Sequence, residues 1–554
     1  MSHQQRPPAR IVAAIILDVL AHPAPSQKVI ETAIRAHVQK TPFQFPTIAS
    51  LVKAYRIVIK TRPRHLGVER LLRCKTVRTD SGVAPITLLT KPYACPGKCV
   101  YCPTEARMPK SYVASEPAAA RALSLKFDPY NQVVQRVQAL ERNGHDAKKI
   151  ELIIKGGTWS AYPWAYRKWF VKRCFDAANH LGLAQRKPRY GSLVTSQKAN
   201  ESATYRMIGI TIETRPDWIT PKEIIRLREL GVTRVEVGVQ ALDDEILAIT
   251  KRGHTVEHTV QATALLKAAA FKTDYHILPG QPGATVARDI EMFDQLFSDD
   301  RFCPDMIKLY PCVVLPSAEL ADWHAKGLYT PLEGEELIEM MVRMQSVIPR
   351  YCRVSRLIRD FPSFEISGGN KVTNLRDVIE TRMKERGIQC QCLRCREAGH
   401  RPPLAIDTKL QIFSDVYRNA FGTEYFLSVE DAERTTVVSF LRLRLPDHEP
   451  IIDNPHTKKM VQEVAQAFPE LRNSAFVREL HTYGQSLTLA DSREGAVQHQ
   501  GWGKILMAEA EKIACEQGYV SLVVISGIGV RAYYRKRGFR LAGTYMKKRI
   551  VSKP

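Results

Sequence analysis

Three cysteines stand close together in one short stretch, KPYACPGKCVYCPTE, as Cys95, Cys99 and Cys102. The C-x3-C-x2-C spacing can bring three thiolates onto one face of a four-iron cluster, which leaves one iron without a protein ligand. Clusters that only carry electrons normally take four cysteines. Because an open iron can bind a small molecule and pass an electron into it, the spacing predicts chemistry at this loop rather than electron storage.

A zinc site and a disulfide are the two alternative uses of these thiols. A structural zinc site needs a fourth Cys or His nearby, and the chain has neither between Cys102 and His145. A disulfide framework suits a secreted protein. Twelve cysteines in 554 residues, with no clear secretory segment in front of them, are typical of reduced thiols. The iron–sulfur interpretation is therefore favoured over another metal or a disulfide.

The cysteine loop resembles the signature of the radical S-adenosylmethionine (SAM) enzymes. In that family, the amino and carboxylate groups of SAM chelate the open iron, and electron transfer cleaves the sulfonium to yield a 5′-deoxyadenosyl radical. The resemblance implies that Cys95, Cys99 and Cys102 hold a [4Fe-4S] cluster whose ligand is SAM.

Short apolar segments that alternate with helical patterns surround this loop, from about residue 81 to residue 315. Helical patterns follow most of the apolar segments. Six strands alternating with helices predict a parallel βα array, an α/β fold, and the number matches the partial (β/α)6 barrel of the radical SAM fold. Active groups in such barrels sit at the C-terminal strand ends. The expected strands are 86–89, 150–155, 208–213, 234–239, 273–278 and 306–309, and the clearest helices are 129–143, 221–230 and 256–269.

Two glycines follow the second expected strand. At Gly156 and Gly157 the missing side chains let the backbone approach a ligand closely. In the radical SAM family this position often reads Gly-Gly-Glu and contacts the methionine end of SAM. This chain has Thr158 in third place, which removes the acidic side chain from that contact.

Polar residues also end the third and fourth expected strands. Glu213 is a candidate for the SAM amino group, and a salt bridge to Arg215 is the alternative. Gln240 ends the fourth strand, and Arg252 follows it. We expect Gln240 and Arg252 to contribute to the SAM site.

A second group of thiols lies downstream in the stretch IQCQCLRCREAGH. Cys390, Cys392 and Cys395 have C-x-C-x2-C spacing, which predicts a structural zinc site if a fourth ligand folds in. Cys312, after the sixth expected strand, is the predicted fourth ligand, and His400 is the competing one. Free surface thiols are the alternative, although clustered exposed thiols oxidise easily.

A different pattern begins near residue 410 with an expected pair of antiparallel hairpins. Further along, Gln498 and the stretch Gly501-Trp502-Gly503 open an expected helix at 504–517, and a helix N-terminus with glycines offers backbone N–H groups to a pyrophosphate. The flanking strands and the segment AYYRKRGF resemble the GNAT acetyltransferase fold, whose ligand is acetyl-CoA. Tyr533 and Tyr534 stand where that family keeps a tyrosine near the thioester sulfur, and core packing is the alternative for each.

The charge of the chain is strongly positive, with a formal net value of +24, which favours polyanionic partners. Nine Lys or Arg residues and one acid, Glu69, lie between residues 53 and 78. A solvated surface is the alternative to nucleic acid here, but a one-sided stretch beside a catalytic loop favours RNA binding. The predicted RNA-binding residues are Lys53, Arg56, Lys60, Arg62, Arg64, Arg70, Arg73, Lys75 and Arg78.

A radical SAM barrel joined to a GNAT fold resembles the catalytic-subunit family of Elongator, which modifies the wobble uridine of tRNA. The strings GITIETRPD, GVQALDD, KRGHTV, VRELHTYG, QHQGWG and AYYRKRGF carry the resemblance from about residue 80 to the C-terminus. The short cysteine spacing and the C-x-C-x2-C group are more similar to archaeal and bacterial members. They imply a single chain that works without the other Elongator subunits, and the sequence leaves open whether it forms a homodimer.

That resemblance implies the reaction and further site residues. A 5′-deoxyadenosyl radical would take hydrogen from the acetyl group of acetyl-CoA, and the acetyl carbon would add to C5 of uridine 34, giving 5-carboxymethyluridine after thioester hydrolysis. Lys149 matches an acetyl-CoA contact reached from the barrel. The implied acetyl-CoA contacts of the GNAT fold are Glu479, Leu480, His481, Thr482, Gln498, Gly501, Trp502, Gly503, Lys504 and Tyr534.

The expected organisation is a basic helical tRNA-binding region at 1–80, a radical SAM barrel at 81–385, a zinc-binding linker at 386–410 and a GNAT α+β region at 411–554. No apolar run is long enough to span a membrane, and a cytoplasmic enzyme is expected. The competing hypothesis is a protein lysine acetyltransferase in which the iron–sulfur cluster is only structural.

Overall fold

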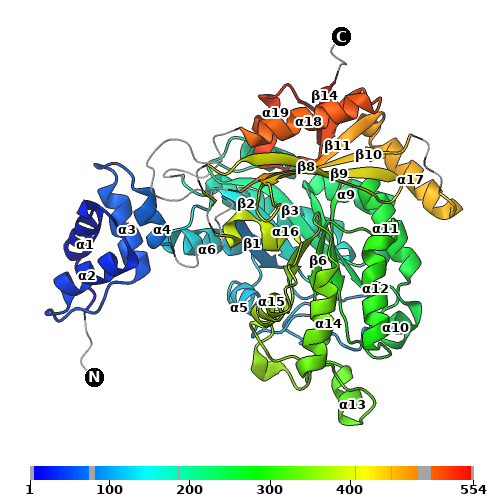
Figure 1. Ribbon diagram of the computed structural model, residues 1–554, viewed down its shortest axis with the longest axis horizontal. Coiled ribbons are helices and arrows are strands. Elements are labelled where there is room, and N and C mark those ends of the chain that lie inside the picture. The colour runs from blue at the N-terminus through cyan, green and yellow to red at the C-terminus, as the bar shows by residue number, and fades with distance from the viewer. Residues whose placement is uncertain are drawn as a thin grey trace.

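The computed structural model describes a chain of two sheets and a separate group of N-terminal helices (Figure 1). The described residues are 5–73, 82–183, 188–402, 404–405, 407–448, 450, 452–483 and 501–550.

The first sheet is parallel throughout, and its strands follow one another in chain order. It forms the half-barrel expected from the sequence, with a seventh strand that the apolar pattern did not reveal. That strand, RVSR, is short and its two ends are charged. The strands are β1 (Ala84–Leu89), β2 (Lys149–Lys155), β3 (Arg206–Thr214), β4 (Arg234–Gln240), β5 (Lys272–Ile277), β6 (Met306–Leu309) and β7 (Arg353–Arg356).

Helices cover the outer face of this sheet, and their ends are fixed by local sequence. Thr220 caps α9, Pro221 occupies its first turn, and Gly231 ends it with a left-handed φ of 84°. The helices of the barrel are α5 (Pro117–Ser124), α6 (Pro129–Arg142), α7 (Trp164–His180), α8 (Leu193–Asn200), α9 (Pro221–Leu230), α10 (Asp244–Ile249), α11 (Val256–Ala268), α12 (Val286–Ser298), α13 (Leu320–Ala325), α14 (Gly334–Ser346), α15 (Leu375–Glu385) and α16 (Leu393–Arg396).

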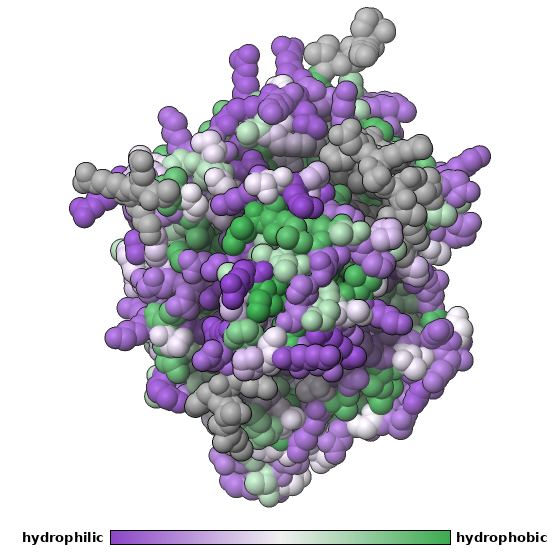
Figure 2. All heavy atoms as spheres, turned by 90° about the vertical axis from the view of Figure 1, so that its left-hand side faces the viewer, coloured by the Kyte–Doolittle hydropathy of each residue, from purple (hydrophilic) through white to green (hydrophobic). Residues whose placement is uncertain are grey.

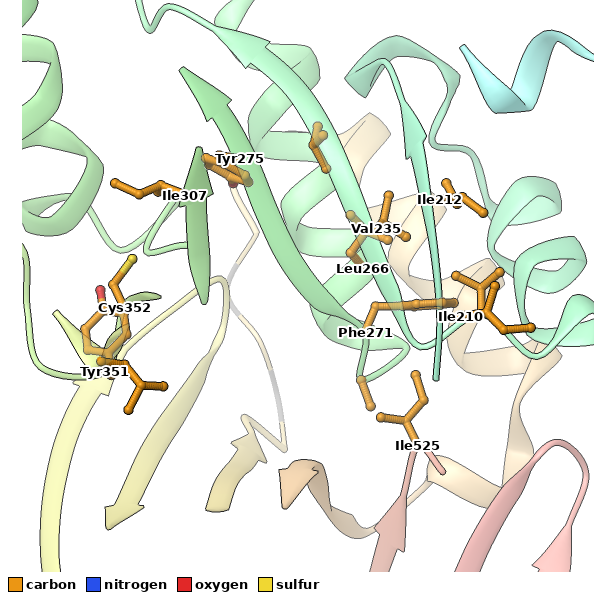
Figure 3. Packing of buried hydrophobic residues seen from close by; sticks show 14 of the residues in the cluster. Ile210, Ile212, Val235, Leu266, Phe271, Tyr275, Ile307, Tyr351, Cys352 and Ile525 are labelled. Carbon is orange, nitrogen blue, oxygen red and sulfur yellow. The ribbon is translucent and has the colours of Figure 1, made fainter. Parts of the chain in front are cut away.

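The main core lies between the strands and these helices. Alternate residues of the strands, such as Ile210, Ile212 and Val235, point outward into this core, where Val235 lies beside Leu266 of α11 (Figure 3). The other alternate residues of the same strands point into the half-barrel, so the strand period of two separates an apolar outer layer from the inner one.

The second sheet is mixed and lies across one end of the half-barrel, at the top of Figure 1. Its strand order is β13-β14-β12-β11-β10-β9-β8, and only β11 and β12 pair in parallel. Its elements are β8 (Leu410–Arg418), β9 (Gly422–Asp431), β10 (Val437–Pro446), α17 (Pro455–Ala467), β11 (Ser474–Thr482), α18 (Trp502–Glu516), β12 (Ser521–Val524), α19 (Arg531–Arg535), β13 (Arg540–Ala542) and β14 (Tyr545–Arg549).

The two sheets meet through backbone contacts as well as side chains. After β12, Ile525 lies below Phe271 and Ile210 of the barrel core (Figure 3). A Cβ atom on Gly527 would come within 1.9 Å of the Ile208 carbonyl oxygen and 3.0 Å of the Gly209 nitrogen, in β3. Only glycine permits this approach, which joins the second sheet to the N-terminal half of β3.

Four helices form the N-terminal region, which has a hydrophobic core of its own. They are α1 (Ala9–Ala21), α2 (Gln27–Val38), α3 (Ile48–Val58) and α4 (Leu66–Leu71). This region lies at the left of Figure 1 beside α6. Among the described residues, none of the helices has both the length and the apolar character needed to cross a membrane.

Candidate functional site

The predicted cluster cysteines and most of the predicted SAM residues line a single cavity of about 280 Å³ at the C-terminal ends of the barrel strands. Parallel strands bring their following loops to one edge, which explains why residues so distant in sequence meet here. The residues from the sequence-based set that line it are Cys95, Cys99, Cys102, Gly157, Glu213, Gln240 and Arg252. Gly156 does not line the cavity.

Arg252 ties the cysteine loop to β4. Its guanidinium donates to the Cys99 Sγ at 3.3 Å and to the Gly238 carbonyl at 2.6 Å. A hydrogen bond from Cys102, together with the Arg252 cation, holds the pKa of Cys99 well below its usual range. Arg252 therefore contacts the cysteine loop directly.

The surroundings of the three thiols fit an anionic iron–sulfur cluster. Arg215 uses two of its nitrogens on Asp217, at 2.8 and 2.9 Å, and its buried Nη1 has no hydrogen-bond partner in the described chain. A Cβ on Gly97 would meet that Nη1 at 2.6 Å and the sulfurs of Cys99 and Cys95 at 3.5 and 3.6 Å. The unpaired guanidinium N–H therefore faces the space between the thiolates, where cluster sulfides would accept it.

The backbone conformation and close neighbours of the loop after β2 explain why glycine occupies positions 156 and 157. Gly156 has φ 152°, and a Cβ there would lie 1.9 Å from the Thr90 Oγ1, so only glycine fits beside that side chain. Gly157 has φ 78° and borders the cavity. Thr158 directs its Oγ1 to the Cys95 Sγ, 3.6 Å away, so the residue that departs from Gly-Gly-Glu contacts a cluster ligand.

Glu213 does not form the salt bridge to Arg215 that was the alternative from sequence. It accepts the Tyr112 hydroxyl at 2.6 Å and lies 3.4 Å from the Lys155 Nζ. Burial alone would raise the pKa of Glu213, but Lys155, His276 and the Tyr112 hydrogen bond together lower it below its usual value. A carboxylate that stays ionised in a cavity suits a cationic ligand group such as the SAM ammonium.

Gln240 is held in a strained backbone conformation. It ends β4 with φ 74°, although it is not a glycine, and its carbonyl accepts the Leu278 amide at 2.9 Å. Such left-handed residues cost free energy and gather at functional sites.

Several charged side chains in the cavity were not found from the sequence. The Glu236 carboxylate pairs with Lys155 and Lys308 and accepts from the His276 Nε2 at 3.0 Å. Asp274 is buried, and its Oδ1 has no partner among the described residues. The sequence pattern that could have revealed them is the alternation of side chains along a strand. In β4, RVEVGVQ, every second residue faces the cavity: Arg234, Glu236, Gly238 and Gln240.

The second cysteine group is drawn together, but Cys312 is not part of it. The sulfurs of Cys390, Cys392 and Cys395 lie within 4.8 Å of one another. Cys312 instead lines the barrel cavity after β6 and packs with Tyr329, and burial raises its pKa to about 12. The prediction of Cys312 as the fourth ligand is therefore corrected. The competing residue, His400, pairs with Glu397 at 2.9 Å.

Part of the predicted acetyl-CoA set converges in the second sheet. A Cβ on Gly503, at the start of α18, would lie 3.0 Å from the Tyr533 hydroxyl, 3.7 Å from the Thr482 Oγ1 and 3.8 Å from Leu480. Tyr534 instead belongs to the buried core beside Phe539. The structure therefore places Tyr533, rather than Tyr534, next to the helix opening.

The other predicted acetyl-CoA residues have the following positions. The His481 ring stacks on Phe440, and the Glu479 carboxylate accepts Lys272 and Arg442, both at 3.0 Å, so its oxygens are engaged within the protein. Lys149 is exposed at the first position of β2. Gly501, Trp502 and Lys504 stand at the start of α18, while Gln498 lies outside the described residues.

The basic N-terminal stretch is largely on the surface. Lys53, Arg56, Lys60, Arg62 and Arg64 are exposed, and Arg64 pairs with Glu69 at 2.8 Å. Figure 2 shows this side of the molecule, where hydrophilic side chains surround a smaller apolar area. Arg70 and Arg73 are half-buried, and Lys75 and Arg78 lie outside the described residues.

Comparison with known proteins agrees with the barrel and its cavity. Residues 90–296 match the Radical SAM superfamily, and residues 304–385 match the Radical SAM C-terminal domain.

Similar curated proteins cover most of the chain. The tRNA uridine(34) acetyltransferase of Methanocaldococcus infernus is 42% identical over 87% of this chain and 88% of its own length, and that of Dehalococcoides mccartyi is 40% identical over 86% and 99%. Elongator complex protein 3 of Homo sapiens is 34% identical over 94% and 92%.

A solved structure supports the same relationship. An archaeal Methanocaldococcus infernus Elongator protein 3 with an N-terminal deletion is 38% identical, covering 84% of this chain and 99% of its own, with a TM-score of 0.71. The radical SAM family implies a [4Fe-4S] cluster and SAM, which the cavity residues fit. The chain belongs to the family of the tRNA uridine(34) acetyltransferases and Elongator complex protein 3.

Proposed function

We propose that this chain is a tRNA-modifying enzyme that builds a carboxymethyl group on C5 of the wobble uridine, using SAM and acetyl-CoA. The observation that carries the proposal is the single cavity in which three cysteines, Glu213 and Gln240 meet at the C-terminal strand ends. The names of the family members, which act on tRNA uridine 34, supply the substrate class.

Cys95, Cys99 and Cys102 would hold the [4Fe-4S] cluster. When bound, the cluster supplies the electron that cleaves SAM to methionine and a 5′-deoxyadenosyl radical. The chain's own residues orient the reactants: Arg252 fixes Cys99 relative to β4, and the ionised Glu213 accepts the SAM ammonium. The enclosing barrel excludes water and stray hydrogen donors from the radical.

Acetyl-CoA would bind the second sheet at the start of α18. Backbone N–H groups at this helix N-terminus suit the pyrophosphate, and Thr482 and Tyr533 flank the opening. The acetyl methyl group would give up a hydrogen atom to the radical, and the resulting carbon radical would add to C5 of the uracil. The adduct would return one electron to the cluster and lose the C5 proton, and hydrolysis of the thioester would leave the carboxylate. Lys149 would contact acetyl-CoA from the barrel side.

The exposed cations of α3 and the residues that follow it would bind the tRNA anticodon stem-loop. Phosphate contacts of this kind give affinity without choosing sequence, and a base in a loop leaves its stack at low cost. On the resemblance to archaeal and bacterial members, we infer that the chain works without other Elongator subunits. Zinc at Cys390, Cys392 and Cys395 would be structural.

The test is nucleoside mass spectrometry of tRNA after anaerobic incubation with the iron-reconstituted enzyme, SAM, reductant and acetyl-CoA. We expect 5-carboxymethyluridine at position 34, together with 5′-deoxyadenosine. Modified uridine formed equally well by a Cys99→Ala/Cys102→Ala variant would refute the radical mechanism. Acetylation of protein lysines without any tRNA product would favour the lysine acetyltransferase hypothesis.

A further inference from the structure

The two ligand regions lie at opposite ends of the same barrel. The cysteine loop follows the C-terminal end of β1, and the cavity residues Gly157 and Gln240 stand at the C-terminal ends of β2 and β4. The second sheet instead contacts the N-terminal ends. Lys272, the first residue of β5, donates to Glu479 of β11 at 3.0 Å, and Gly527 abuts Gly209 of β3. An acetyl group bound at the second sheet is thus separated from the cluster by the barrel interior.

That interior is charged rather than apolar. The inner layers of such barrels are usually filled by Val, Ile and Leu, but here Lys155, Glu236 and Lys308 meet on the inner face of the sheet. Each buried ion costs several kcal/mol in lost hydration, so stability alone does not account for them. Asp274 adds a carboxylate that is 1% exposed, lines the cavity, and keeps one oxygen without a partner in the described chain.

The cavity extends from the cysteines to the N-terminal end of the strands. Its lining includes Arg234, the first residue of β4. The Arg234 guanidinium pairs with Glu151 of β2 at 3.0 Å and donates to the Thr211 Oγ1 at 2.9 Å. In the pairing of β4 and β5, Arg234 lies opposite Lys272, whose ammonium donates to the Glu479 carboxylate of the second sheet at 3.0 Å. The Arg234–Glu151 pair forms the floor between the cavity and the acetyl-CoA region.

One position in this floor has no side chain. Gly209 lies directly opposite Glu151 in the pairing of β2 and β3. A Cβ there would make only ordinary contacts, 3.4 Å from the Thr233 Oγ1 and 3.9 Å from the Glu151 Cγ. The φ of Gly209 is not in the left-handed region, so its backbone conformation does not require glycine. Ile153, the inward residue between Glu151 and Lys155, supplies an apolar wall above it.

We propose that the barrel interior is a binding site for the acyl-thioester end of acetyl-CoA, reached from the N-terminal face between Glu151, Gly209 and Arg234. The thioester carbonyl accepts an N–H from Lys155 or Lys308, the methyl group lies along Ile153, and the reacting carbon points toward the cysteine loop. This site rests on the proposed function, since it assumes that acetyl-CoA is the carbon donor. Such a site would let the acetyl group of a CoA bound at the second sheet reach the cysteine loop without entering solvent.

The test follows deuterium from [2H3]acetyl-CoA into 5′-deoxyadenosine, in the full-length, iron-reconstituted enzyme with SAM, reductant and tRNA. The proposed route of the acyl group runs from the N-terminal face of the barrel past Gly209 and then past Ile153. Gly209→Leu and Ile153→Phe each place a larger side chain in this route. Gly191→Leu is the matched control, because its Cβ would meet nothing within 4 Å. Iron content, CoA affinity measured by calorimetry and the apparent melting temperature report whether each variant is folded and keeps its two outer sites.

We expect the wild type and Gly191→Leu to transfer deuterium equally. Both narrowed variants should lose about 100-fold in deuterium transfer, the scale expected when a reacting group is misplaced by about an ångström, while keeping iron content and CoA affinity. Full transfer by either narrowed variant in folded form would overturn the route through the barrel. No transfer in the wild type would overturn the proposed function instead, so the two failures are distinguishable.

A gain-of-function variant keeps the proposal testable if a narrowed variant does not fold. Ile153→Ala enlarges the same wall, so it should raise the ratio of product from propionyl-CoA to product from acetyl-CoA by about tenfold. That factor is the discrimination expected for one methylene in an apolar pocket. An unchanged ratio, with CoA affinity retained, would contradict the placement of the acyl group beside Ile153.

Discussion

The Asp305 carboxylate, just before β6, accepts both terminal nitrogens of Arg478 in β11, at 2.7 and 2.5 Å. Neither side chain is exposed to solvent. The same carboxylate accepts the Lys267 ammonium at 3.2 Å. Burial by itself would raise the pKa of Asp305, but Arg478 and Lys267 hold it well below the usual range. A dry ion pair therefore joins the barrel to the second sheet.

Asp305→Asn should destabilise the protein strongly, because it leaves Arg478 and Lys267 as two buried cations that share the single carboxylate of Glu424. Removing one partner of a buried pair typically costs about 3–5 kcal/mol. Asp294→Asn is the matched control: its pair with Arg343 spans 3.3 Å in solvent, and such screened pairs contribute at most about 1 kcal/mol. Urea unfolding followed by circular dichroism measures both, and equal effects would contradict the assigned role.

Cys99→Ser should abolish iron incorporation and SAM cleavage, because the cluster has no spare thiolate in this loop. Cys515→Ser, at a half-buried cysteine of α18, should leave both unchanged. Iron analysis and the visible absorbance of the anaerobically reconstituted proteins provide the comparison. A Cys99→Ser variant with full iron content would show that the cluster is held elsewhere.

Cys392→Ser should remove bound zinc and lower the apparent melting temperature, since three clustered thiols supply most of a tetrahedral site. Cys312→Ser should retain zinc, because that thiol lines the barrel cavity instead. Zinc analysis by mass spectrometry distinguishes the two. Loss of zinc from the Cys312 variant would restore the ligand set predicted from sequence.

Gly157→Ala should weaken SAM binding, because φ 78° is strained for alanine by about 1–2 kcal/mol and the added carbon would lie 3.0 Å from the Lys110 carbonyl oxygen. Gly191→Ala adds the same methyl group where nothing lies within 4 Å. Anaerobic calorimetry with SAM compares the two variants at matched iron content. Equal affinities would mean that this backbone does not shape the SAM site.

Asp289 gives a pH dependence of stability. Its Oδ2 accepts the Gly280 amide at 2.7 Å, and burial raises its pKa to about 7. The pKa of this carboxyl is near 4 in the unfolded chain and about 7 in the folded protein. Between these two pH values, folded Asp289 keeps a proton that the unfolded chain has released. The free energy of unfolding therefore falls as pH rises through that window. Over the whole window, the free energy of unfolding falls by about 4 kcal/mol on account of Asp289.

Asp289→Asn should remove that contribution. The apparent melting temperature of the wild type should fall more between pH 5 and pH 8 than that of the variant, because all other titrating groups are shared. Parallel curves of melting temperature against pH would contradict the raised pKa of Asp289.

Local sequence patterns were sufficient for much of the barrel. The expected strands at 150–155 and 306–309 differ from β2 and β6 by at most one residue, because apolar runs between helices leave few alternatives. The three thiols of the cysteine loop are close in sequence, so their closeness in space could also be predicted. The fourth-ligand assignment of Cys312 was wrong because nothing in the chain order says which wall a residue after β6 faces.

The charged interior could not be read from the sequence. Lys155 and Lys308 end or interrupt apolar strands, and an isolated lysine there is normally a sign of a solvated strand end. Their pairing with Glu236 depends on the register of the five adjacent strands from β2 to β6, which is a tertiary property. The choice between Tyr533 and Tyr534 likewise follows from the direction of α19 relative to Gly503.

The meeting of Gly527 with the backbone of Ile208 and Gly209 restricts how this chain can be recombined. Two main chains that touch in this way tolerate no change of register, and no side chain at Gly527. A chimera that exchanges only the second sheet with a relative would have to inherit the facing segment of β3 as well. Shuffling experiments should therefore cut the chain so that residues 206–209 and 525–530 travel together.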